Sequence, residues 1–178
     1  MYMQVIEQVP KTALDVFKLL PEGTLCEVID NVLYMSPTPK YNHQRLLGLL
    51  FNKICNHVDH TKTGEVIISP FDVYFDHLLS AVQPDLLFVS NSNRSILKED
   101  GYIHGAPDLI VEVLSSNKKR DTVEKRSLYE RAGVKEYFIV NPVDRKIQCY
   151  RLTNNEYDLV YDQDGMFTST ILDLSFSF

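Results

Sequence analysis

Apolar residues recur at helical spacing in two stretches of the chain, and we expect a helix in each. The longer stretch covers residues 41–58, and its apolar positions are Leu46, Leu47, Leu50, Ile54 and Val58. Steps of three and four residues between such positions predict a helix that buries one face. A shorter stretch at residues 12–20 predicts a second helix, which Pro21 and Gly23 end.

A third helix is predicted by its start, its stop and one apolar face. Asp121 and Glu124 are spaced as a capping-box pair, and Gly133 stands where a helix often ends in a left-handed residue. The apolar face over residues 123–132 consists of Leu128, Tyr129 and Ala132. On a helical wheel, Lys125 lies at the centre of this face.

Short runs of apolar or alternating residues predict β-strands between and after the helices. The expected strands cover residues 65–69, 71–76, 82–89, 107–115, 137–140, 146–152, 156–161 and 169–174. Residues 25–35 predict a β-hairpin, because Asp30 and Asn31 both tolerate the left-handed conformation of a tight turn. Strands that surround two longer helices predict an α/β or α+β fold.

The composition is that of one globular domain. The chain has 178 residues, of which 44% are hydrophobic and 24% are charged. It shows no internal repeat, low-complexity tract or linker-like stretch, so we expect a single domain over residues 1–178. No apolar run is long enough to cross a bilayer, and the N-terminal residues lack the basic and apolar segments of a secretory signal.

The cysteines indicate the compartment. Cys26, Cys55 and Cys149 lie far apart and form no C-x-x-C motif. This scatter argues against a disulfide framework and against a structural zinc site. We expect unreactive thiols in a reducing environment, and hence a cytoplasmic protein that does not associate with a membrane.

Charge is unevenly distributed along the chain. The 18 Lys and Arg residues against 24 Asp and Glu residues give a net charge of −6. This value argues against nucleic-acid binding, since proteins that bind nucleic acids usually carry a basic surface. Residues 118–135, however, contain seven basic and three acidic residues. This basic strip is compatible with a contact to a phosphate backbone and equally with an exposed helix face.

Three carboxylates stand at or within the apolar strands. Asp85 and Asp108 each follow a proline at the start of a predicted strand, where a proline need not donate to the ladder. Glu112 stands in the middle of the most hydrophobic strand. Because burying a carboxylate alone costs several kcal/mol, Glu112 must be paired, hydrogen-bonded or bound to a metal. A buried ion pair would satisfy it, but we favour a metal site.

Strand geometry selects the partner of Glu112. Asp108 is four residues away on the same strand, so the two Cα atoms are about 13 Å apart. Carboxylates that share one Mg²⁺ each bind it at about 2.1 Å, and that separation is hard to bridge. If the strands at 82–89 and 107–115 are antiparallel neighbours, Asp85 lies beside Glu112. We therefore predict a metal site at Asp85 and Glu112 and a structural role for Asp108.

Lys125 is expected to point toward the sheet. A lysine at the centre of an apolar helix face can also lay its stem along the core and turn its ammonium outward. The helix that follows the strand of Glu112 packs back over it, however. This packing would bring the Lys125 ammonium toward the two carboxylates.

Several segments together resemble a known family. They are CEVIDNVLYM in the hairpin, VQPDLLFV, GAPDLIVEVLSSN, the D-x-x-x-K-x-x-x-Y pattern of the third helix, and GVKEYFIVNP. From the hairpin to about Pro142, the chain resembles the Uma-type restriction endonucleases of the PD-(D/E)XK superfamily. The resemblance implies a restriction-endonuclease-like core, in which helices flank a mixed central β-sheet, with an additional N-terminal hairpin and C-terminal β-strands.

The resemblance also implies a set of catalytic residues. Asp85 matches the aspartate of the signature, and Glu112 matches its second acid. The superfamily usually carries a lysine two residues after that acid, where this chain has a leucine. The family resembled takes its lysine from the next helix, where this chain has Lys125, and Lys118 and Lys119 compete for the same role.

Further positions match the family around these residues. Glu27 lies on an otherwise apolar face of the hairpin, and His43 lies on the apolar face of the long helix. Either is expected to approach the site and orient a water molecule or a phosphate, although a core histidine explains His43 equally well. A backbone carbonyl near Val113 is expected to complete the metal ligands.

The implied function is a Mg²⁺-dependent endonuclease that hydrolyses phosphodiester bonds of nucleic acid. We expect DNA as the substrate, Mn²⁺ as a substitute metal and a homodimer as the assembly. The alternative is a catalytically inactive nuclease-fold protein that serves as a binding or assembly module. Metal binding at Asp85 and Glu112 separates the two hypotheses. An unrelated enzyme that pairs His43 with a cysteine has no supporting motif.

Overall fold

The computed structural model of the protein describes residues 9–115 and 119–178. The helices of this part are α1 (Ala13–Phe17), α2 (Tyr41–Thr61) and α3 (Arg126–Ala132). A π-helical segment, Arg120–Lys125, lies directly before α3, and two short 3-10 helices cover Asp76–Leu78 and Asn91–Ile96. The helices predicted at residues 12–20 and 41–58 are confirmed, the first with fewer residues than expected.

Six strands form the central sheet, in the order β11-β10-β9-β8-β6-β3. Their bounds are Gly64–Ile68 (β3), Leu86–Ser90 (β6), Leu109–Val113 (β8), Glu136–Val140 (β9), Lys146–Thr153 (β10) and Glu156–Asp164 (β11). β8 and β9 are parallel, and the other neighbouring pairs are antiparallel. Parallel neighbours need a crossover connection, which α3 and the π-helical segment provide.

A second sheet has five short strands, in the order β2-β1-β5-β4-β7. Their bounds are Cys26–Ile29 (β1), Val32–Met35 (β2), Val73–Phe75 (β4), Ser80–Val82 (β5) and Ile103–His104 (β7). β1 and β2 form the predicted hairpin, with Asp30 and Asn31 at positive φ in its turn. β12 (Met166–Ser169) and β13 (Leu174–Ser177) pair separately.

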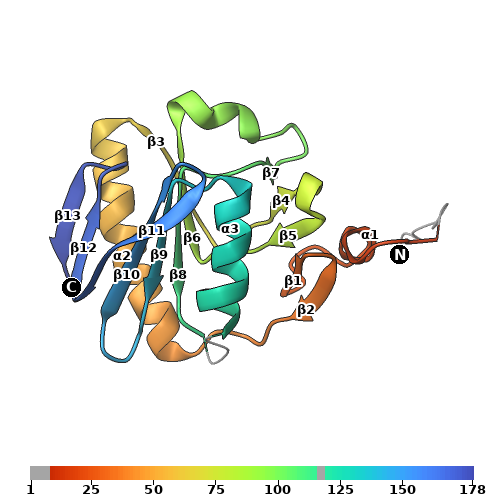
Figure 1. The fold of residues 1–178 in the computed structure, drawn as a ribbon, viewed down its shortest axis with the longest axis horizontal. Helices are drawn as coiled ribbons and strands as arrows, with labels where there is room; N and C mark the ends of the chain where they lie inside the picture. Colours follow the sequence, from red (N-terminus) through yellow and green to blue (C-terminus); the bar gives the residue numbers. More distant parts are fainter. Residues whose placement is uncertain (1–8, 116–118) are drawn as a thin grey trace.

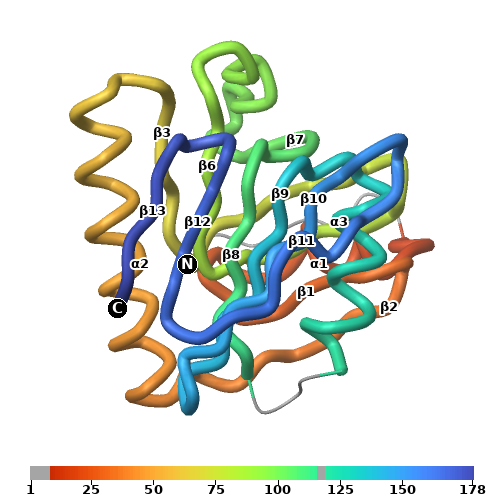
Figure 2. The backbone as a smooth tube through the Cα atoms, turned by 60° about the vertical axis from the view of Figure 1, so that its left-hand side comes forward, coloured from red at the N-terminus to blue at the C-terminus, as the bar shows by residue number. Residues whose placement is uncertain are grey.

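The central sheet lies between two layers. α2 covers one face, and α3 covers the other (Figures 1 and 2). Leu86 and Phe88 of β6 belong to the core under α2, whereas Leu87 and Val89 belong to the core under α3. The sequence of a strand that is buried on both faces is a nearly continuous run of apolar residues, as in β6 and β8. The predicted mixed sheet flanked by helices is confirmed.

The prediction of a single strand over residues 82–89 is wrong, because two strands share these residues. β5 ends at Val82 in the five-stranded sheet, and β6 begins at Leu86 in the central sheet. The apolar pattern continues across the break because both ends are buried. Pro84, which has no N–H for a ladder hydrogen bond, lies where the chain passes from one sheet to the other.

Two other expectations need correction. Residues 169–174 are not one strand, because residues 170–173 form the turn between β12 and β13, with Asp173 at φ 50°. The third helix ends at Gly133 as predicted, with φ 92°, but its start has no capping box. Instead, the Asp121 carboxylate accepts hydrogen bonds from the N–H and hydroxyl of Ser115.

Two further expectations concerned the cysteines and membrane-spanning segments. The three cysteines are free, as predicted, and two of them are buried. In the described ranges, no helix is both long and apolar enough to cross a membrane.

Candidate active site

Asp85 and Glu112 meet where β6 and β8 lie side by side. The two strands are antiparallel, with Leu86 opposite Val111, so Asp85 lies one position further on, beside Glu112. Both side chains are buried, since the two residues keep only 9% and 3% of their surface exposed. The predicted proximity of the two carboxylates is therefore confirmed.

Asp85 is held by a backbone amide and a histidine. The N–H of Val113 donates to Oδ2 of Asp85 at 2.8 Å. Nε2 of His43, in the first turn of α2, lies 3.1 Å from the same oxygen. Burial lowers the pKa of His43, but the hydrogen bond to Asp85 and the charge of Asp85 outweigh burial and raise the pKa above its ordinary value. The expectation that His43 approaches the site is confirmed.

Glu112 is held by two side chains of the crossover segment. Nζ of Lys125 donates to Oε1 of Glu112 at 2.9 Å, and the hydroxyl of Tyr129 donates to the same oxygen at 2.7 Å. Lys125 keeps only 4% of its surface exposed. It therefore points toward the sheet as predicted, and the alternative of an outward ammonium is wrong.

Glu27 brings the five-stranded sheet to the same cluster. Its Oε1 lies 2.8 Å from Nζ of Lys125 and accepts the N–H of Gln83 at 2.9 Å. Gln83 belongs to the segment that connects the two sheets, directly before Pro84. The ammonium of Lys125 thus joins a carboxylate from each sheet.

Carboxylates outnumber basic side chains in the described part of the buried cluster. Glu27, Asp85, Glu112 and Asp121 are four buried carboxylates near the buried ammonium of Lys125. Burial raises the pKa of Glu112 well above its ordinary value, Lys125 offsets part of this shift, and Asp85 and Glu27 raise the pKa further. Burial lowers the pKa of Lys125, but Glu112 and Glu27 outweigh it and raise the pKa, so the ammonium stays charged.

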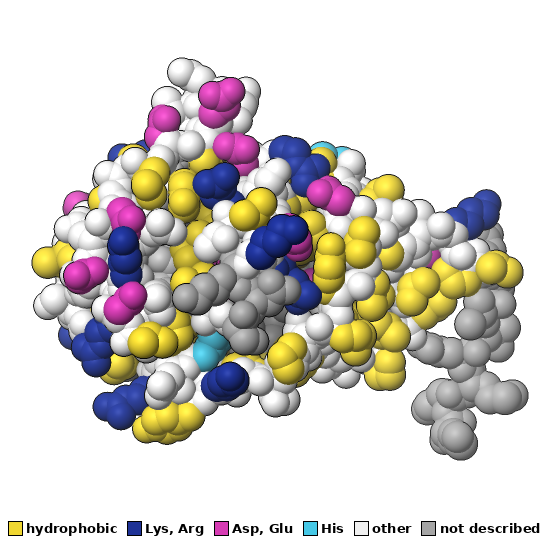
Figure 3. Space-filling model, turned by 60° about the horizontal axis from the view of Figure 1, so that its bottom comes forward, with side chains coloured by type: hydrophobic (Ala, Val, Ile, Leu, Met, Phe, Trp, Pro, Cys, Tyr) yellow, Lys and Arg dark blue, Asp and Glu magenta, His cyan; other side chains and the backbone are white. Residues whose placement is uncertain are grey.

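The cluster lines an open cleft with a volume of about 730 Å³. Arg120 also lines it, and its guanidinium lies 4.6 Å from the centre of the Tyr34 ring. Nε of Arg120 is buried and has no hydrogen-bond partner within residues 9–115 and 119–178. Figure 3 shows Lys and Arg side chains scattered over one face of the molecule, several of them near its middle, and Asp and Glu side chains mostly toward its upper and left parts.

The other two candidate lysines differ from Lys125. Lys119 is exposed and is not among the residues that line the cleft. Lys118 lies outside the described residues. Within the described part of the chain, Lys125 is therefore the candidate lysine that contacts the carboxylates.

Asp108 is paired at the far end of the same strand. Its carboxylate accepts the N–H of Ser90 at 2.8 Å and forms an ion pair with Lys135. Burial raises the pKa of Asp108, but the hydrogen bonds to Lys135 and Ser90 outweigh it and lower the pKa. Asp108 therefore stabilises the connection of β6, β8 and β9, in agreement with its predicted structural role.

Sequence reasoning missed the roles of two side chains, Tyr129 and Arg120. Tyr129 was placed in the apolar helix face and in the D-x-x-x-K-x-x-x-Y pattern but not beside Glu112, although it stands four residues after Lys125 and therefore on the same side of the helix. That spacing was a usable signal. Arg120 gave no comparable signal, because its position depends on contact with Tyr34 of the distant hairpin.

The donor set fits a divalent cation that keeps several water ligands. Both polar contacts of Asp85 go to Oδ2, and both of Glu112 go to Oε1. The second oxygen of each carboxylate has no hydrogen-bond donor among the described residues. In the same residues, no three His, Cys, Asp or Glu side chains form a group that could hold a metal. Mg²⁺ commonly binds through only one or two carboxylates and retains water, so two free oxygens suffice for it.

The mixed sheet, the crossover helix and the acid–lysine cluster define a restriction-endonuclease-like fold. The chain belongs to the Uma2 family, because the family model described as "Putative restriction endonuclease" matches residues 14–176. A search of curated proteins finds no match.

One solved structure is similar over almost the whole chain. It is described as "a putative nuclease belonging to DUF820 from Anabaena variabilis ATCC 29413", with a TM-score of 0.75 and 22% identity, and the match covers 94% of this chain and 95% of that chain. A second match is the type IIG restriction endonuclease BpuSI, with a TM-score of 0.42 and 13% identity over 72% of this chain and 14% of that chain. The first structure supports the fold.

Proposed function

We propose that the protein is a Mg²⁺-dependent endonuclease that hydrolyses phosphodiester bonds of DNA. The observation that carries this proposal is the pair of buried carboxylates, Asp85 and Glu112, both of which line the cleft. Each has one oxygen without a donor among the described residues. The family description, which names a restriction endonuclease, supports nucleic acid as the substrate class and DNA as the particular substrate.

Asp85 and Glu112 would hold Mg²⁺ through these oxygens, with a backbone carbonyl near Val113 as a further ligand and Mn²⁺ as a substitute. A bound divalent cation lowers the pKa of a water molecule and neutralises charge that develops on phosphate oxygens. Such a cation would add its charge to that of Lys125 beside four carboxylate residues that are buried.

The chain's own groups orient these carboxylates and offset their charge. Lys125 places a fixed positive charge between Glu27 and Glu112, where it would stabilise an attacking hydroxide or the charge of the transition state. His43 fixes the orientation of Asp85, and Tyr129 fixes that of Glu112. All of these contacts form before substrate arrives, so little reorganisation is needed during the reaction.

The rim of the cleft would bind the phosphate backbone. Arg120 lies at the cleft with its guanidinium fixed against Tyr34, and a guanidinium is well suited to phosphate oxygens. Lys119, which precedes Arg120 in the chain, is exposed and adds positive charge beside it. Such contacts position a nucleic acid without reading its sequence.

The test is cleavage of supercoiled plasmid DNA, single-stranded DNA and RNA with Mg²⁺, Mn²⁺ or a chelator. Wild type is compared with Asp85→Asn, Glu112→Gln and Lys125→Met, and Glu124→Gln serves as the matched control. Glu124 lies next to Lys125 in the chain but does not line the cleft. We expect metal-dependent cleavage of DNA by wild type and Glu124→Gln, and a loss of about 100-fold or more in the three site variants.

The outcomes separate the hypotheses. Cleavage that survives in Glu112→Gln would identify a contaminant and refute the assignment. A preference for RNA would refute DNA as the substrate and leave the site in place. Absence of both cleavage and Mn²⁺ binding by calorimetry would favour the inactive binding or assembly module.

Homodimer formation and cytoplasmic location remain predictions. β11 lies at an edge of the central sheet and exposes Leu159 and Val160, and an exposed edge strand is a surface on which a second copy can pair. Sedimentation-velocity measurement of the mass tests the dimer: a monomeric mass at micromolar concentration would contradict it.

A further inference from the structure

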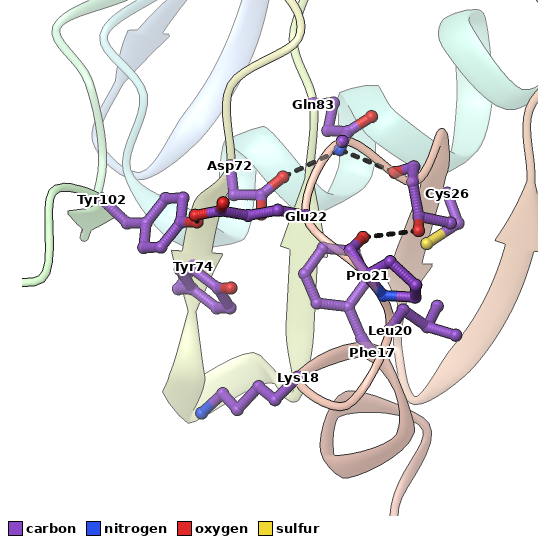
Figure 4. A pocket seen from close by; sticks show the side chains of 12 residues that line it. Phe17, Lys18, Leu20, Pro21, Glu22, Cys26, Asp72, Tyr74, Gln83 and Tyr102 are labelled. Atoms are coloured by element: carbon purple, nitrogen blue, oxygen red, sulfur yellow. Dashed lines mark hydrogen bonds between the residues drawn. The ribbon is translucent and has the colours of Figure 1, made fainter. Parts of the chain in front are cut away.

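A second hollow, separate from the cleft, lies between α1, the loop after it and β4. Its volume is about 420 Å³. The side chains that matter here are Phe17, Glu22, Asp72, Tyr74, Gln83 and Tyr102 (Figure 4). Gln83 also lines the cleft, so the two cavities lie on either side of the segment that connects the sheets.

Two carboxylates of the hollow lack a positive partner. Asp72 accepts the side-chain amide of Gln83 at 2.8 Å, and Glu22 accepts the hydroxyl of Tyr102 at 3.2 Å. Neither forms an ion pair within the described part of the chain. Lys18 at the rim binds Asp76 instead, at 3.3 Å. Burial raises the pKa of Asp72, and the charge of Glu22 raises it further, as expected for two neighbouring acids without a cation.

Tyr74 directs a polar group without a partner into the hollow. The residue is 7% exposed, and its hydroxyl forms no hydrogen bond to any described residue. Figure 4 shows this hydroxyl facing the space between the acidic side chains and Phe17. Burial raises the pKa of Tyr74, so the hydroxyl stays neutral and can accept a hydrogen bond.

Aromatic rings form part of the remaining walls, together with Leu20, Pro21 and Lys18, whose ammonium lies 5.5 Å from the centre of the Tyr74 ring. The ring of Tyr74 meets that of Phe17 edge to face at 5.9 Å and that of Tyr102 edge to face at 5.8 Å. An apolar wall beside two carboxylates and a hydroxyl matches a ligand with a positive head that carries N–H groups and a short apolar body.

We propose that this hollow binds a small organic cation with a primary ammonium on an alkyl chain. The three N–H donors of the ammonium would pair with Asp72, Glu22 and the hydroxyl of Tyr74, and the alkyl chain would lie against Phe17. The proposal does not depend on the endonuclease function, because it uses other residues and its test measures no cleavage.

The test is calorimetric titration of the full chain with n-butylammonium chloride. n-Butanol has the same chain without the charge, and tetramethylammonium chloride has the charge without N–H donors. We expect binding of n-butylammonium at least about tenfold tighter than of either control, since hydrogen bonds to charged groups contribute strongly.

Variants locate the site. We expect Asp72→Asn and Glu22→Gln to weaken binding of n-butylammonium about tenfold or more, and Tyr74→Phe to weaken it roughly threefold to tenfold. Glu156→Gln, which removes an exposed carboxylate on β11, should leave binding unchanged. Glu22 is exposed, so its variant keeps the test decisive if Asp72→Asn fails to fold.

Four results would overturn the proposal. Equal binding of n-butanol would mean that the hollow is only an apolar cavity. Equal binding of tetramethylammonium would mean that N–H donors are not recognised. Absence of binding at millimolar n-butylammonium, or an equal loss of affinity in Glu156→Gln, would mean that the acidic hollow is not the site.

Discussion

Replacing Lys125 with methionine removes the ammonium that contacts Glu27 and Glu112 in the candidate active site. The substitution keeps an unbranched apolar stem of similar length, so packing against the sheet changes little. It deletes contacts of 2.8 Å to Glu27 and 2.9 Å to Glu112. Both carboxylates are then left buried, with exposures of 4% and 3%, and without their cation.

The expected loss of stability is large. Breaking a buried ion pair by removing one partner costs about 3–5 kcal/mol, because the remaining charge is uncompensated. For a chain of this length, that loss corresponds to a fall in melting temperature of roughly 6–20 °C. The folded-state pKa of Glu112 is already raised by burial, and removing the nearby cation raises it further. The deficit should therefore be smallest below the ordinary pKa of a glutamate and should grow as pH rises through the folded-state pKa.

Urea denaturation followed by circular dichroism measures the effect, at about pH 7 and again at about pH 4.5. Lys146→Met is the matched control, because Lys146 forms a pair with Asp162 at 3.1 Å with 47% of its side chain exposed. Exposed pairs contribute only about 0–1 kcal/mol. The double variant Lys125→Met with Glu112→Gln should recover part of the lost stability, since it removes one of the two uncompensated charges.

A loss below about 1 kcal/mol for Lys125→Met would refute the reasoning, because it would place this residue in the range of exposed pairs. So would a deficit that shrinks as pH rises from about 4.5 to about 7. Failure of Glu112→Gln to recover any stability would show that Lys125 and Glu112 do not interact.

Three further substitutions test other charged groups. Glu136→Ala leaves a guanidinium and two hydroxyls without their acceptor, so we expect a loss of about 3 kcal/mol in urea denaturation. Asp108→Asn breaks the ion pair with Lys135, and we expect Mn²⁺ binding measured by calorimetry to stay unchanged. The folded-state pKa of Asp108 is lowered. The variant should therefore be less stable than wild type above about pH 4, and the difference should vanish as pH falls through the folded-state pKa of Asp108. Burial lowers the pKa of His104, but two flanking aspartates outweigh burial and raise the pKa. The melting temperature of His104→Gln should therefore fall below that of wild type at about pH 5.5 and match it at about pH 8.

Each of these expectations has a contrary result. A Glu136→Ala variant within about 0.5 kcal/mol of wild type would mean that its donors find water instead. Loss of Mn²⁺ binding in Asp108→Asn would assign Asp108 to the metal site. A melting-temperature difference for His104→Gln that grows with pH would reverse the assigned direction of its pKa shift.

The spacing of residues within single strands and helices was sufficient to predict that Asp85, Glu112 and Lys125 lie close together. Strand alternation and an antiparallel register placed Asp85 beside Glu112, and helical periodicity placed Lys125 on the face that meets the sheet. These inferences hold because the faces of a strand or helix follow directly from residue spacing. They required only one assumption about tertiary structure, which was that neighbouring elements pack together.

Contacts between the hairpin and the crossover segment could not be predicted in the same way. The ion pair of Glu27 with Lys125 and the stacking of Arg120 on Tyr34 depend on how the hairpin packs against the crossover segment. Spacing along the chain carries no information about that packing. The division of residues 82–89 into two strands could not be predicted for a related reason. Apolar residues on both sides of the break are buried, although in different sheets, so the apolar pattern does not change at the break.

A comparison of two buried glutamates shows why burial alone does not identify a functional carboxylate. Glu136 on β9 is fully buried, yet sequence reasoning did not single it out, because it stands at the start of an apolar strand. Its Oε1 accepts from Arg151 at 3.1 Å and from the hydroxyl of Thr170 at 2.6 Å, and its Oε2 accepts from the hydroxyl of Ser169 at 2.6 Å.

Glu112 differs from Glu136 in its second oxygen. Its donors, Lys125 and Tyr129, both contact Oε1, and Oε2 has no donor among the described residues. Because Glu112 lines the cleft, this oxygen beside Asp85 is available to an added cation, whereas the oxygens of Glu136 are saturated by their donors. Mn²⁺ should therefore raise the melting temperature of wild type and of Glu136→Gln by the same amount, and should leave that of Glu112→Gln unchanged.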